Sequence, residues 1–321
     1  MQMKSFLLLS LFIIQYSMAD SQMRRYVVAS DGSGDFKTVQ QAFDAIDSNN
    51  KNPVLIFVKH GIYKEKLHLD SGKNYVTLVG ENKDKTTLTF DDHTGKMSST
   101  GELINTRTSW TFRIDANDFR AENITIDNNA GFSAGQAVAL MINGDRCVFL
   151  NCRITGFQDT LFLSSENSRC YFRSCYIEGT TDFIFGAAIA WFGRCLVYSK
   201  KNSHITAAST PANHPFGFVF NQCRFIAADS VNKVTLGRPW RPYASVTYMN
   251  AYLANHIVPE GWDNWRNPEN EKTARFAEYR NTGPGAKPSA RVSWSRQLTP
   301  AQARNISMKT IFGDWNPHSK G

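Results

Sequence analysis

The chain has 321 residues, of which 42% are hydrophobic and 20% charged, a composition typical of a folded protein with a sizeable core. Its formal net charge is +8, yet its lysines and arginines form no run longer than pairs such as Lys200-Lys201. This scatter excludes a basic nucleic-acid-binding arm. It favours either a diffuse positive field that attracts an acidic polymer or a charge bias that serves only solubility.

Residues 1–19 are predicted to be a secretory signal peptide. An apolar segment, Phe6 to Ile14, is followed by small residues that end at Ala19, just before Asp20. That segment is too short to cross a bilayer, and no later stretch approaches 18 apolar residues. We therefore expect a secreted protein, extracellular or periplasmic, without a membrane span, whose residues 20–321 form a single domain.

The N-terminal part of the mature chain predicts a short strand and then one helix. Tyr26 to Ala29 has strand character, and the turn-rich segment 31–35 follows it. From Thr38, a plausible N-cap, apolar residues recur at helical spacing; they are Val39, Ala42, Phe43 and Ile46. Such a helix would cap one end of the domain.

After this helix the hydrophobic period becomes that of strands. The predicted strands are short and bounded by Gly, Asn, Asp or Lys; they are Val54 to Val58, Tyr75 to Val79, Thr86 to Phe90, Thr111 to Ile114, Asn123 to Ile126 and Gln136 to Leu140. No helix-length segment separates them, which excludes an alternating β-α-β fold and leaves stacked strands or a β-sandwich.

An internal repeat decides between these two folds. Residues 146–163, RCVFLNCRITGFQDTLFL, correspond in register to residues 169–186, RCYFRSCYIEGTTDFIFG, at an offset of 23 residues. Repeats of this period are typical of solenoids. We therefore predict an all-β fold, a parallel β-helix, in which equivalent residues lie about 4.8 Å apart on adjacent coils.

Four Phe-x-x-Cys motifs extend the repeat, with their cysteines at Cys152, Cys175, Cys195 and Cys223, and Cys147 and Cys170 form a second matched pair. Buried thiols that pack inside the coils explain this pattern. Because the chain is predicted to be exported, a disulfide between Cys195 and Cys223 is the alternative.

The register makes Asp159 and Asp182 stacked neighbours. Two carboxylates this close cannot both ionise easily, so their pKa values separate, which suits a general acid beside a nucleophile or base. Such a pair of carboxylates could instead bind calcium. Because calcium needs six to eight oxygen ligands and no third carboxylate lies nearby in sequence, we expect no metal.

Two glutamines accompany the aspartates. Gln136 lies 22 residues before Gln158, which is about one coil. Their side-chain amides would donate hydrogen bonds to a developing oxyanion. Either glutamine alone would be interpreted as an ordinary polar surface residue.

The segment Lys233 to Trp240 predicts a further strand, which ends in Arg238 and Trp240. Arg238 could hold a carboxylate bidentately and Trp240 could stack on a sugar ring. An ordinary strand end with a buried tryptophan is the alternative. Beyond Trp262 the strand pattern fades into an irregular tail, where Thr299-Pro300 predicts a helix that packs outside the coils.

Together, these segments resemble the pectin methylesterases. The matching blocks occur in the family's order and are GIYKEK (61–66), QAVAL (136–140), GFQDTL (156–161), DFIFG (182–186) and LGRPW (236–240), with further similarity at residues 31–36, 278–286 and 312–317. The resemblance thus covers nearly the whole mature chain. It implies a right-handed parallel β-helix that removes methyl esters from pectin.

The resemblance also assigns roles. Asp182 would be the nucleophile, Asp159 the general acid and then base, and Gln136 and Gln158 the oxyanion hole. The expected substrate contacts are Thr106, Gln136, Arg238, Trp240 and Trp262, with Arg238 also orienting Asp182.

The sequence also departs in two ways from the pattern of the plant members of this family. No inhibitor-like pro-region is expected, and Cys152 lacks the partner that plant members place near Ile124. We expect a monomer that needs no cofactor and acts on methyl-esterified pectin. Two alternatives remain, a lyase or polygalacturonase on the same fold and a catalytically silent β-helix that binds polysaccharide.

Overall fold

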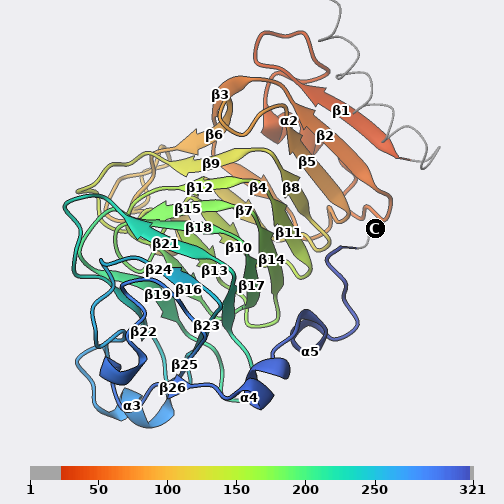
Figure 1. The fold of residues 1–321 in the computed structure, drawn as a ribbon. Helices are drawn as coiled ribbons and strands as arrows, with labels where there is room; N and C mark the ends of the chain where they lie inside the picture. Colours follow the sequence, from red (N-terminus) through yellow and green to blue (C-terminus); the bar gives the residue numbers. More distant parts are fainter. Residues whose placement is uncertain (1–22, 319–321) are drawn as a thin grey trace, which may run out of the picture.

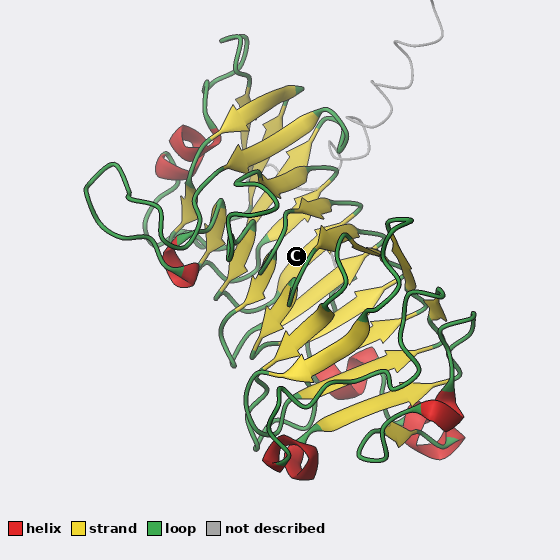
Figure 2. Cartoon of the chain, turned by 90° about the vertical axis from the view of Figure 1, so that its left-hand side faces the viewer, coloured by secondary structure: helices red, strands yellow, loops and turns green. Residues whose placement is uncertain are grey.

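The computed structural model describes residues 23–318, so the predicted signal peptide lies outside the described residues. Within this range the chain winds into stacked coils, and each coil contributes strands to three parallel sheets (Figures 1 and 2). We name these sheets A, B and C in the order in which a coil passes through them. The arrangement confirms the predicted parallel β-helix and excludes the β-sandwich.

Sheet A has 11 strands among the described residues. In spatial order they are β1 (Arg24–Val28), β2 (Val54–Val58), β5 (Val76–Gly80), β8 (Arg120–Glu122), β11 (Cys147–Leu150), β14 (Arg169–Arg173), β17 (Ile189–Gly193), β20 (Phe218–Asn221), β23 (Ser245–Met249), β25 (Arg275–Tyr279) and β26 (Arg296–Gln297).

Sheets B and C complete the coils with eight and seven strands of the described chain. Sheet B contains β3 (Gly61–Lys64), β6 (Thr86–Phe90), β9 (Thr125–Asn128), β12 (Arg153–Thr155), β15 (Tyr176–Gly179), β18 (Leu196–Ser199), β21 (Arg224–Ala227) and β24 (Tyr252–Leu253). Sheet C contains β4 (Leu67–Leu69), β7 (Phe112–Ile114), β10 (Leu140–Ile142), β13 (Leu161–Leu163), β16 (Ile184–Gly186), β19 (His204–Ala208) and β22 (Thr235–Pro239).

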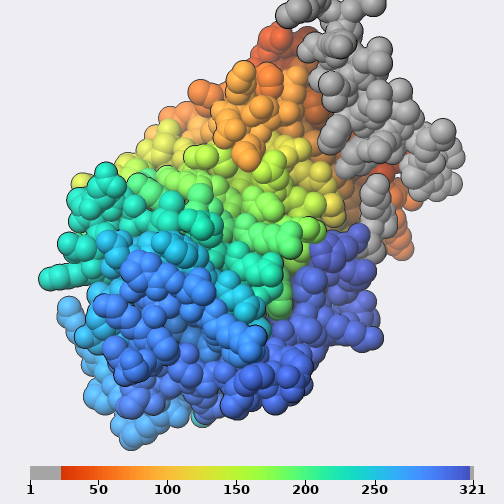
Figure 3. All heavy atoms as spheres, in the orientation of Figure 1, coloured from red at the N-terminus to blue at the C-terminus, as the bar shows by residue number. Residues whose placement is uncertain are grey.

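The predicted register between the two repeat units is confirmed. Cys147 pairs with Cys170 and Phe149 with Phe172 across β11 and β14, an offset of 23 residues. The colours of the sequence therefore follow one another along the stack of coils (Figure 3). Residues distant by one coil in sequence become neighbours at one strand spacing.

A column of aromatic rings fills the interior. Phe149, Phe172 and Phe192 stack with centroids 4.8 Å apart at each step, and Phe220 lies 4.4 Å beyond Phe192. Tyr248 extends the column at 4.8 Å. Because each ring is fully buried, the column contributes a large part of the apolar surface that the coils remove from water.

The six cysteines are free, buried thiols. The thiol of Cys175 donates to the carbonyl of Phe149 on the preceding coil at 3.4 Å, and Cys223 donates likewise to Phe192 at 3.2 Å. Cys195 and Cys223 are not bonded to each other. The structure therefore favours packed thiols over the alternative disulfide.

The corner between sheets A and B explains where several strands begin. Asn123 and Asn151 occupy it with φ angles of 54° and 51°, in the left-handed region. Asparagine tolerates this region because its short side chain bonds locally. The predicted strand Asn123 to Ile126 is therefore displaced to β9. At the entry to sheet A, Tyr75 has φ 61° and lies before β5.

The N-terminal end is capped by α2 (Val39–Asp44), as predicted. Thr38 and Gln41 form a reciprocal capping box, which satisfies free N–H groups at the helix start. Phe43 stacks on Phe112 at 5.5 Å, so the helix closes the open end of the core. No helix within residues 23–318 is long and apolar enough to cross a membrane.

The C-terminal tail is irregular and partly helical, as expected. It contains η2 (Pro288–Ala290), α4 (Pro300–Arg304) and α5 (Met308–Phe312), while α3 (Glu269–Thr273) precedes β25 and η1 (Thr106–Thr108) lies before β7. Thr299 caps α4, and Phe312 packs with Trp191 on the outside of sheet A. The blue tail thus returns along the outside of the green coils in Figure 3.

Candidate active site

The two aspartates lie on adjacent coils where the chain enters sheet C. Leu161 pairs with Ile184, which places Asp159 and Asp182 at equivalent positions one rung apart. Their φ angles are 65° and 49°, so both residues have the same left-handed backbone conformation at equivalent turns. Both residues are nearly buried, with 9% and 6% of their surfaces exposed. The stacked pair expected from the repeat is therefore present.

Arg238 in β22 holds one member of the pair. Its Nε and Nη2 donate to the two carboxylate oxygens of Asp182 at 3.0 and 2.7 Å, a bidentate ion pair. The face of the same guanidinium lies 3.6 Å from the ring centroid of Trp265. Asp182 thus holds the edge of the Arg238 guanidinium group, and Trp265 packs on its face.

The environment separates the two carboxyl groups electrostatically. Burial raises the pKa of Asp159 well above its ordinary value, and the negative charge of Asp182 raises it further. The positive charge of Arg238 partly opposes this shift. Asp159 is consequently the group that retains a proton, while Asp182 is paired with the cation.

Gln136 and Gln158 also lie on adjacent coils. They form an isolated parallel bridge, and the N–H of Ala137 donates to the carbonyl of Gln158 at 3.0 Å. Paired residues of parallel strands project to the same face. Within residues 23–318 neither side-chain amide forms a hydrogen bond, so both NH₂ groups are free to donate.

The predicted strand Gln136 to Leu140 is wrong in its bounds, because β10 begins only at Leu140. The N–H of Val138 bonds the hydroxyl of Ser109 at 3.2 Å, and Asn128 donates to its carbonyl at 3.1 Å. The bond to Ser109 interrupts the backbone ladder at Val138, while Ala137 and Ala139 still donate to Gln158 and Thr160 on the next coil. The two side-chain bonds hold the segment from Gln136 against Ser109, which follows η1, and against the end of β9.

An apolar surface adjoins the carboxylates on the outer face of sheet C. Phe162 and Phe185 stack with centroids 4.3 Å apart, and the ring of Trp240 lies 6.3 and 5.9 Å from them. The guanidinium of Arg107 lies 5.2 Å from the ring centroid of Phe162. Phe162 and Phe185 are only 1% and 4% exposed, so the half-buried Trp240 is the ring of this group that the apolar face of a sugar could contact.

Trp262 does not belong to this surface. Only 3% of it is exposed, and it stacks on Phe276 at 4.3 Å inside the core of the coils. Its indole has no face open to a polysaccharide, so the expected direct contact is corrected. Trp265, three residues later, provides the tryptophan beside Arg238.

Thr106 begins η1 and is half-buried. Its hydroxyl lies 3.3 Å from that of Thr94, whose N–H donates to the carbonyl of Gln136 at 2.9 Å. Two short contacts therefore connect Thr106 to the glutamine pair. These contacts reach the backbone of Gln136, and a substrate contact by Thr106 remains a prediction.

Five residues of the site were not predicted from the sequence. Phenylalanine recurs three residues after each aspartate, at Phe162 and Phe185, but the repeat alone does not show that these rings pack beside the carboxylates. Trp265 and Arg107 had no sequence signal. His204 follows one coil after Asp182, and burial, aided by the charge of Arg238, lowers its pKa.

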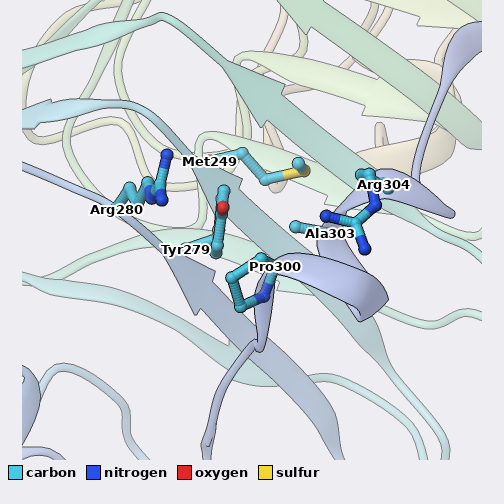
Figure 4. A pocket seen from close by; sticks show the side chains of 6 residues that line it. All are labelled: Met249, Tyr279, Arg280, Pro300, Ala303 and Arg304. Atoms are coloured by element: carbon cyan, nitrogen blue, oxygen red, sulfur yellow. The ribbon is translucent and has the colours of Figure 1, made fainter.

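The two carboxylates belong neither to a metal-binding cluster nor to the pocket shown in Figure 4. Within residues 23–318, no three His, Cys, Asp or Glu side chains gather in a way that could hold a metal ion. A pocket of about 320 Å³ lies on the outer side of sheet A, between β23, β25 and α4 (Figure 4).

Residues 25–314 match the family model described as Pectinesterase. The chain belongs to the pectinesterase family. It is 39% identical over 291 residues to Pectinesterase 31 of Arabidopsis thaliana, which covers 89% of this chain and 90% of that relative. It spans about half the length of other relatives, which are named pectinesterase/pectinesterase inhibitor.

Solved pectin methylesterases share this fold. The enzyme from carrot is 31% identical, with a TM-score of 0.83 over 91% of this chain and 94% of that one. A pectin methylesterase in complex with a hexasaccharide is also 31% identical, with a TM-score of 0.82 over 92% of this chain and 98% of that one. The pectinesterase described here is therefore a right-handed parallel β-helix and a carboxylic ester hydrolase.

Proposed function

We propose that this pectinesterase hydrolyses methyl esters of galacturonate units in pectin, with Asp182 as nucleophile and Asp159 as general acid and then base. The observation that carries this assignment is the asymmetry of the pair. Asp182 is held bidentately by Arg238, whereas burial raises the pKa of its neighbour Asp159. One carboxylate and one carboxylic acid, one rung apart, suit a two-step ester hydrolysis.

In the first step a carboxylate oxygen of Asp182 attacks the ester carbonyl carbon. The carbonyl oxygen becomes an oxyanion, which the free amides of Gln136 and Gln158 stabilise. The bond to the methoxy oxygen then breaks, and Asp159 transfers its proton to that oxygen, so methanol departs. An acyl anhydride on Asp182 remains.

In the second step Asp159, now ionised, takes a proton from water, and the resulting hydroxide attacks the anhydride. The bond between the acyl carbon and Asp182 breaks. Free galacturonate is released, Asp182 is again a carboxylate, and Asp159 has recovered its proton. No metal or cofactor enters this sequence.

The apolar surface beside the carboxylates would hold the substrate. Trp240, which is half-buried, would stack on a sugar ring, and Thr106 would bond a hydroxyl, while the buried rings of Phe162 and Phe185 would support Trp240 from below. Trp262 has no direct part in this scheme. We further propose that the enzyme acts as a secreted monomer on polymeric pectin, in keeping with its predicted signal peptide and its positive charge.

Methanol release from methyl-esterified pectin tests the proposal. Asp182→Asn should lose nearly all turnover, and Asp159→Asn should lower kcat by about 10²–10⁴-fold, the usual contribution of a general acid or base. Circular dichroism and thermal melts must show that both variants fold. A folded Asp182→Asn variant with wild-type methanol release would overturn the nucleophile assignment.

The alternative of a silent polysaccharide-binding β-helix predicts a different result. A silent protein would bind pectin and release no methanol, even at high protein concentration. A lyase or polygalacturonase would instead shorten the polymer, which viscosity and reducing-end assays detect. Methanol release without chain cleavage would separate the esterase from both alternatives.

A further inference from the structure

Cations gather along the corner between sheets A and B, away from the carboxylates. A pocket of about 270 Å³ at this corner is lined in part by Lys83, Arg153 and Arg194. The pocket of Figure 4, on the outer side of sheet A, adjoins the C-terminal end of this corner at Arg280, and Arg304 lines it as well. Both recesses thus lie along one edge of the molecule, and each is bordered by at least two cationic side chains.

The positive charges of this corner are largely not neutralised by the protein. No ion pair within residues 23–318 includes Lys83, Arg194, Arg224, Arg280 or Arg304. Lys83 donates instead to the neutral amide oxygen of Asn151 at 2.7 Å, and Arg194 donates to that of Gln222 at 3.1 Å. These contacts position the cations and leave their charge available to an external anion.

Three carboxylates lie near the corner, and none of them neutralises these cations. Glu122, at the end of β8, pairs with Arg120 at 2.5 Å. Asp84 is 3.7 Å from Arg153, and both side chains are solvent-accessible, so water screens this pair. Glu178 accepts from the hydroxyl of Tyr176 at 2.7 Å and pairs with Lys200 at 3.0 Å, which engages its charge elsewhere. The net field at the corner is positive.

Tyrosine rings alternate with these cations. Arg153 lies over Tyr176 at 4.4 Å, and Arg224 lies over Tyr252 at 4.6 Å. Aromatic faces and guanidinium groups together suit a ligand that has apolar ring faces and carboxylate substituents. An acidic sugar polymer has both.

The repeat sets the length of the surface. From Asn151 to Arg280, left-handed corner residues occur on six successive coils; they are Asn151, Ser174, Arg194, Gln222, Asn250 and Arg280. At one strand spacing per step, they span about 24 Å. Because each coil runs from sheet A through this corner to sheet B and then to sheet C, the corner lies opposite the sheet beside Asp159 and Asp182. A polymer at the corner would leave the active site free.

We propose that the A–B corner is a second binding surface, which takes a de-esterified, anionic stretch of galacturonan. The inference rests on the proposed function, because that stretch is the product of the proposed reaction. Binding to existing product would hold the enzyme on the polymer while the active site works on methyl esters nearby.

The experiment measures the affinity for polygalacturonate in the Asp182→Asn background, by affinity electrophoresis at several salt concentrations. The corner variant replaces four cations by glutamine and combines Lys83→Gln, Arg194→Gln, Arg224→Gln and Arg280→Gln. We expect it to bind roughly tenfold more weakly at low salt, since each exposed ion pair contributes only modestly. Glutamine suits the left-handed positions 194 and 280, because Gln222 already occupies one with φ 58°.

A control variant of equal net charge replaces four exposed lysines that lie elsewhere. It combines Lys37→Gln, Lys51→Gln, Lys287→Gln and Lys309→Gln. Wild-type affinity in this control, with weak binding in the corner variant, supports the proposal. Equal weakening of both would show that only the total charge matters, and unchanged binding in the corner variant would show that the surface takes no polyanion. Either outcome overturns the inference.

The corner and the active site can be tested separately. In an otherwise wild-type background, the corner variant should release methanol from a short esterified oligomer at the wild-type rate, while its KM for partly de-esterified polymer rises. If the wild-type enzyme released no methanol at all, the proposed function would fail, yet the binding comparison in the inactive background would still be readable.

Discussion

Asp159 is a carboxyl group that folding places where its charge is unfavourable. Burial and the neighbouring charge of Asp182 raise its pKa, so the folded state holds its proton over a pH range in which the unfolded chain has released it. Folding stability therefore decreases as pH rises from the unfolded pKa, about 3.9, through the raised pKa of the folded state. The proposed mechanism uses this instability, because the retained proton is the one given to methanol.

We predict that Asp159→Asn is more stable than the wild type at pH 8, because asparagine carries no charge to desolvate. The difference should shrink toward pH 4, where Asp159 is protonated in the folded protein. Urea unfolding at the two pH values measures this. Asp182→Asn provides the contrast, since it leaves the half-buried Arg238 without its partner and should destabilise the protein at pH 8. Equal stability of Asp159→Asn and wild type at pH 8 would contradict the first expectation.

Trp265 is a positioning residue through its contact with Arg238. Trp265→Ala should lower kcat roughly tenfold with little change in KM, because a desolvated cation–π contact contributes up to about 2 kcal/mol to the hold on the guanidinium. Trp265→Phe keeps an aromatic face and should restore most of kcat. Steady-state methanol release gives both constants. A rise in KM alone would mean that Trp265 contacts the substrate instead.

At the scale of elements, the interior depends on stacking between coils more than on any single strand. Most strands of sheets B and C have only three to five residues, so none is stable by itself. Phe172 shows how the coils support one another, since its ring lies between those of Phe149 and Phe192. Loss of one ring therefore affects three coils.

Phe172→Ala should destabilise the protein by about 3–5 kcal/mol, the range for a large ring removed from a close-packed core. Glu166→Ala, in an exposed turn of the same coil, should stay within about 0.5 kcal/mol of the wild type. Denaturant unfolding compares the two variants. A small effect at Phe172 would mean that neighbouring rings collapse into the space.

At the scale of the whole molecule, the C-terminal tail closes a surface that the coils leave apolar. Ile311 and Phe312 of α5 pack against a cluster on the outside of sheet A that includes Tyr171, Trp191 and Val219. The tail thus ties together coils that are contributed by residues far from it in sequence. Its removal would expose a contiguous apolar patch.

The double variant Ile311→Asp, Phe312→Asp should detach the tail. We expect a lower Tm and increased binding of a hydrophobic dye, with kcat nearly unchanged at low temperature because the carboxylates lie beside sheet C. Lys309→Asp, an exposed change in the same helix, is the control. A dye signal equal to that of the control would show that the tail stays bound or that the patch closes without it.

The sequence alone determined the repeat and what depends on it. An offset of 23 residues predicted the register of Phe149 with Phe172 and the stacking of Asp159 and Asp182, because in a parallel β-helix sequence period converts directly into spatial neighbourhood. Local signals sufficed for α2, where Thr38 and the helical spacing of apolar residues agree. The family blocks likewise lie within single short segments.

Only the tertiary structure decided what depends on side chains from distant coils. Nothing in the sequence distinguishes Trp262 from Trp265. In the structure Trp262 stacks on Phe276 inside the core, whereas Trp265 packs on the guanidinium face of Arg238. The bounds of β10 depend on hydrogen bonds between the backbone of Val138 and the side chains of Asn128 and Ser109, which no local sequence pattern predicts. Burial and pairing, which separate Asp159 from Asp182, are properties of the assembled coils, because the two residues have the same chemistry and the same place in the repeat.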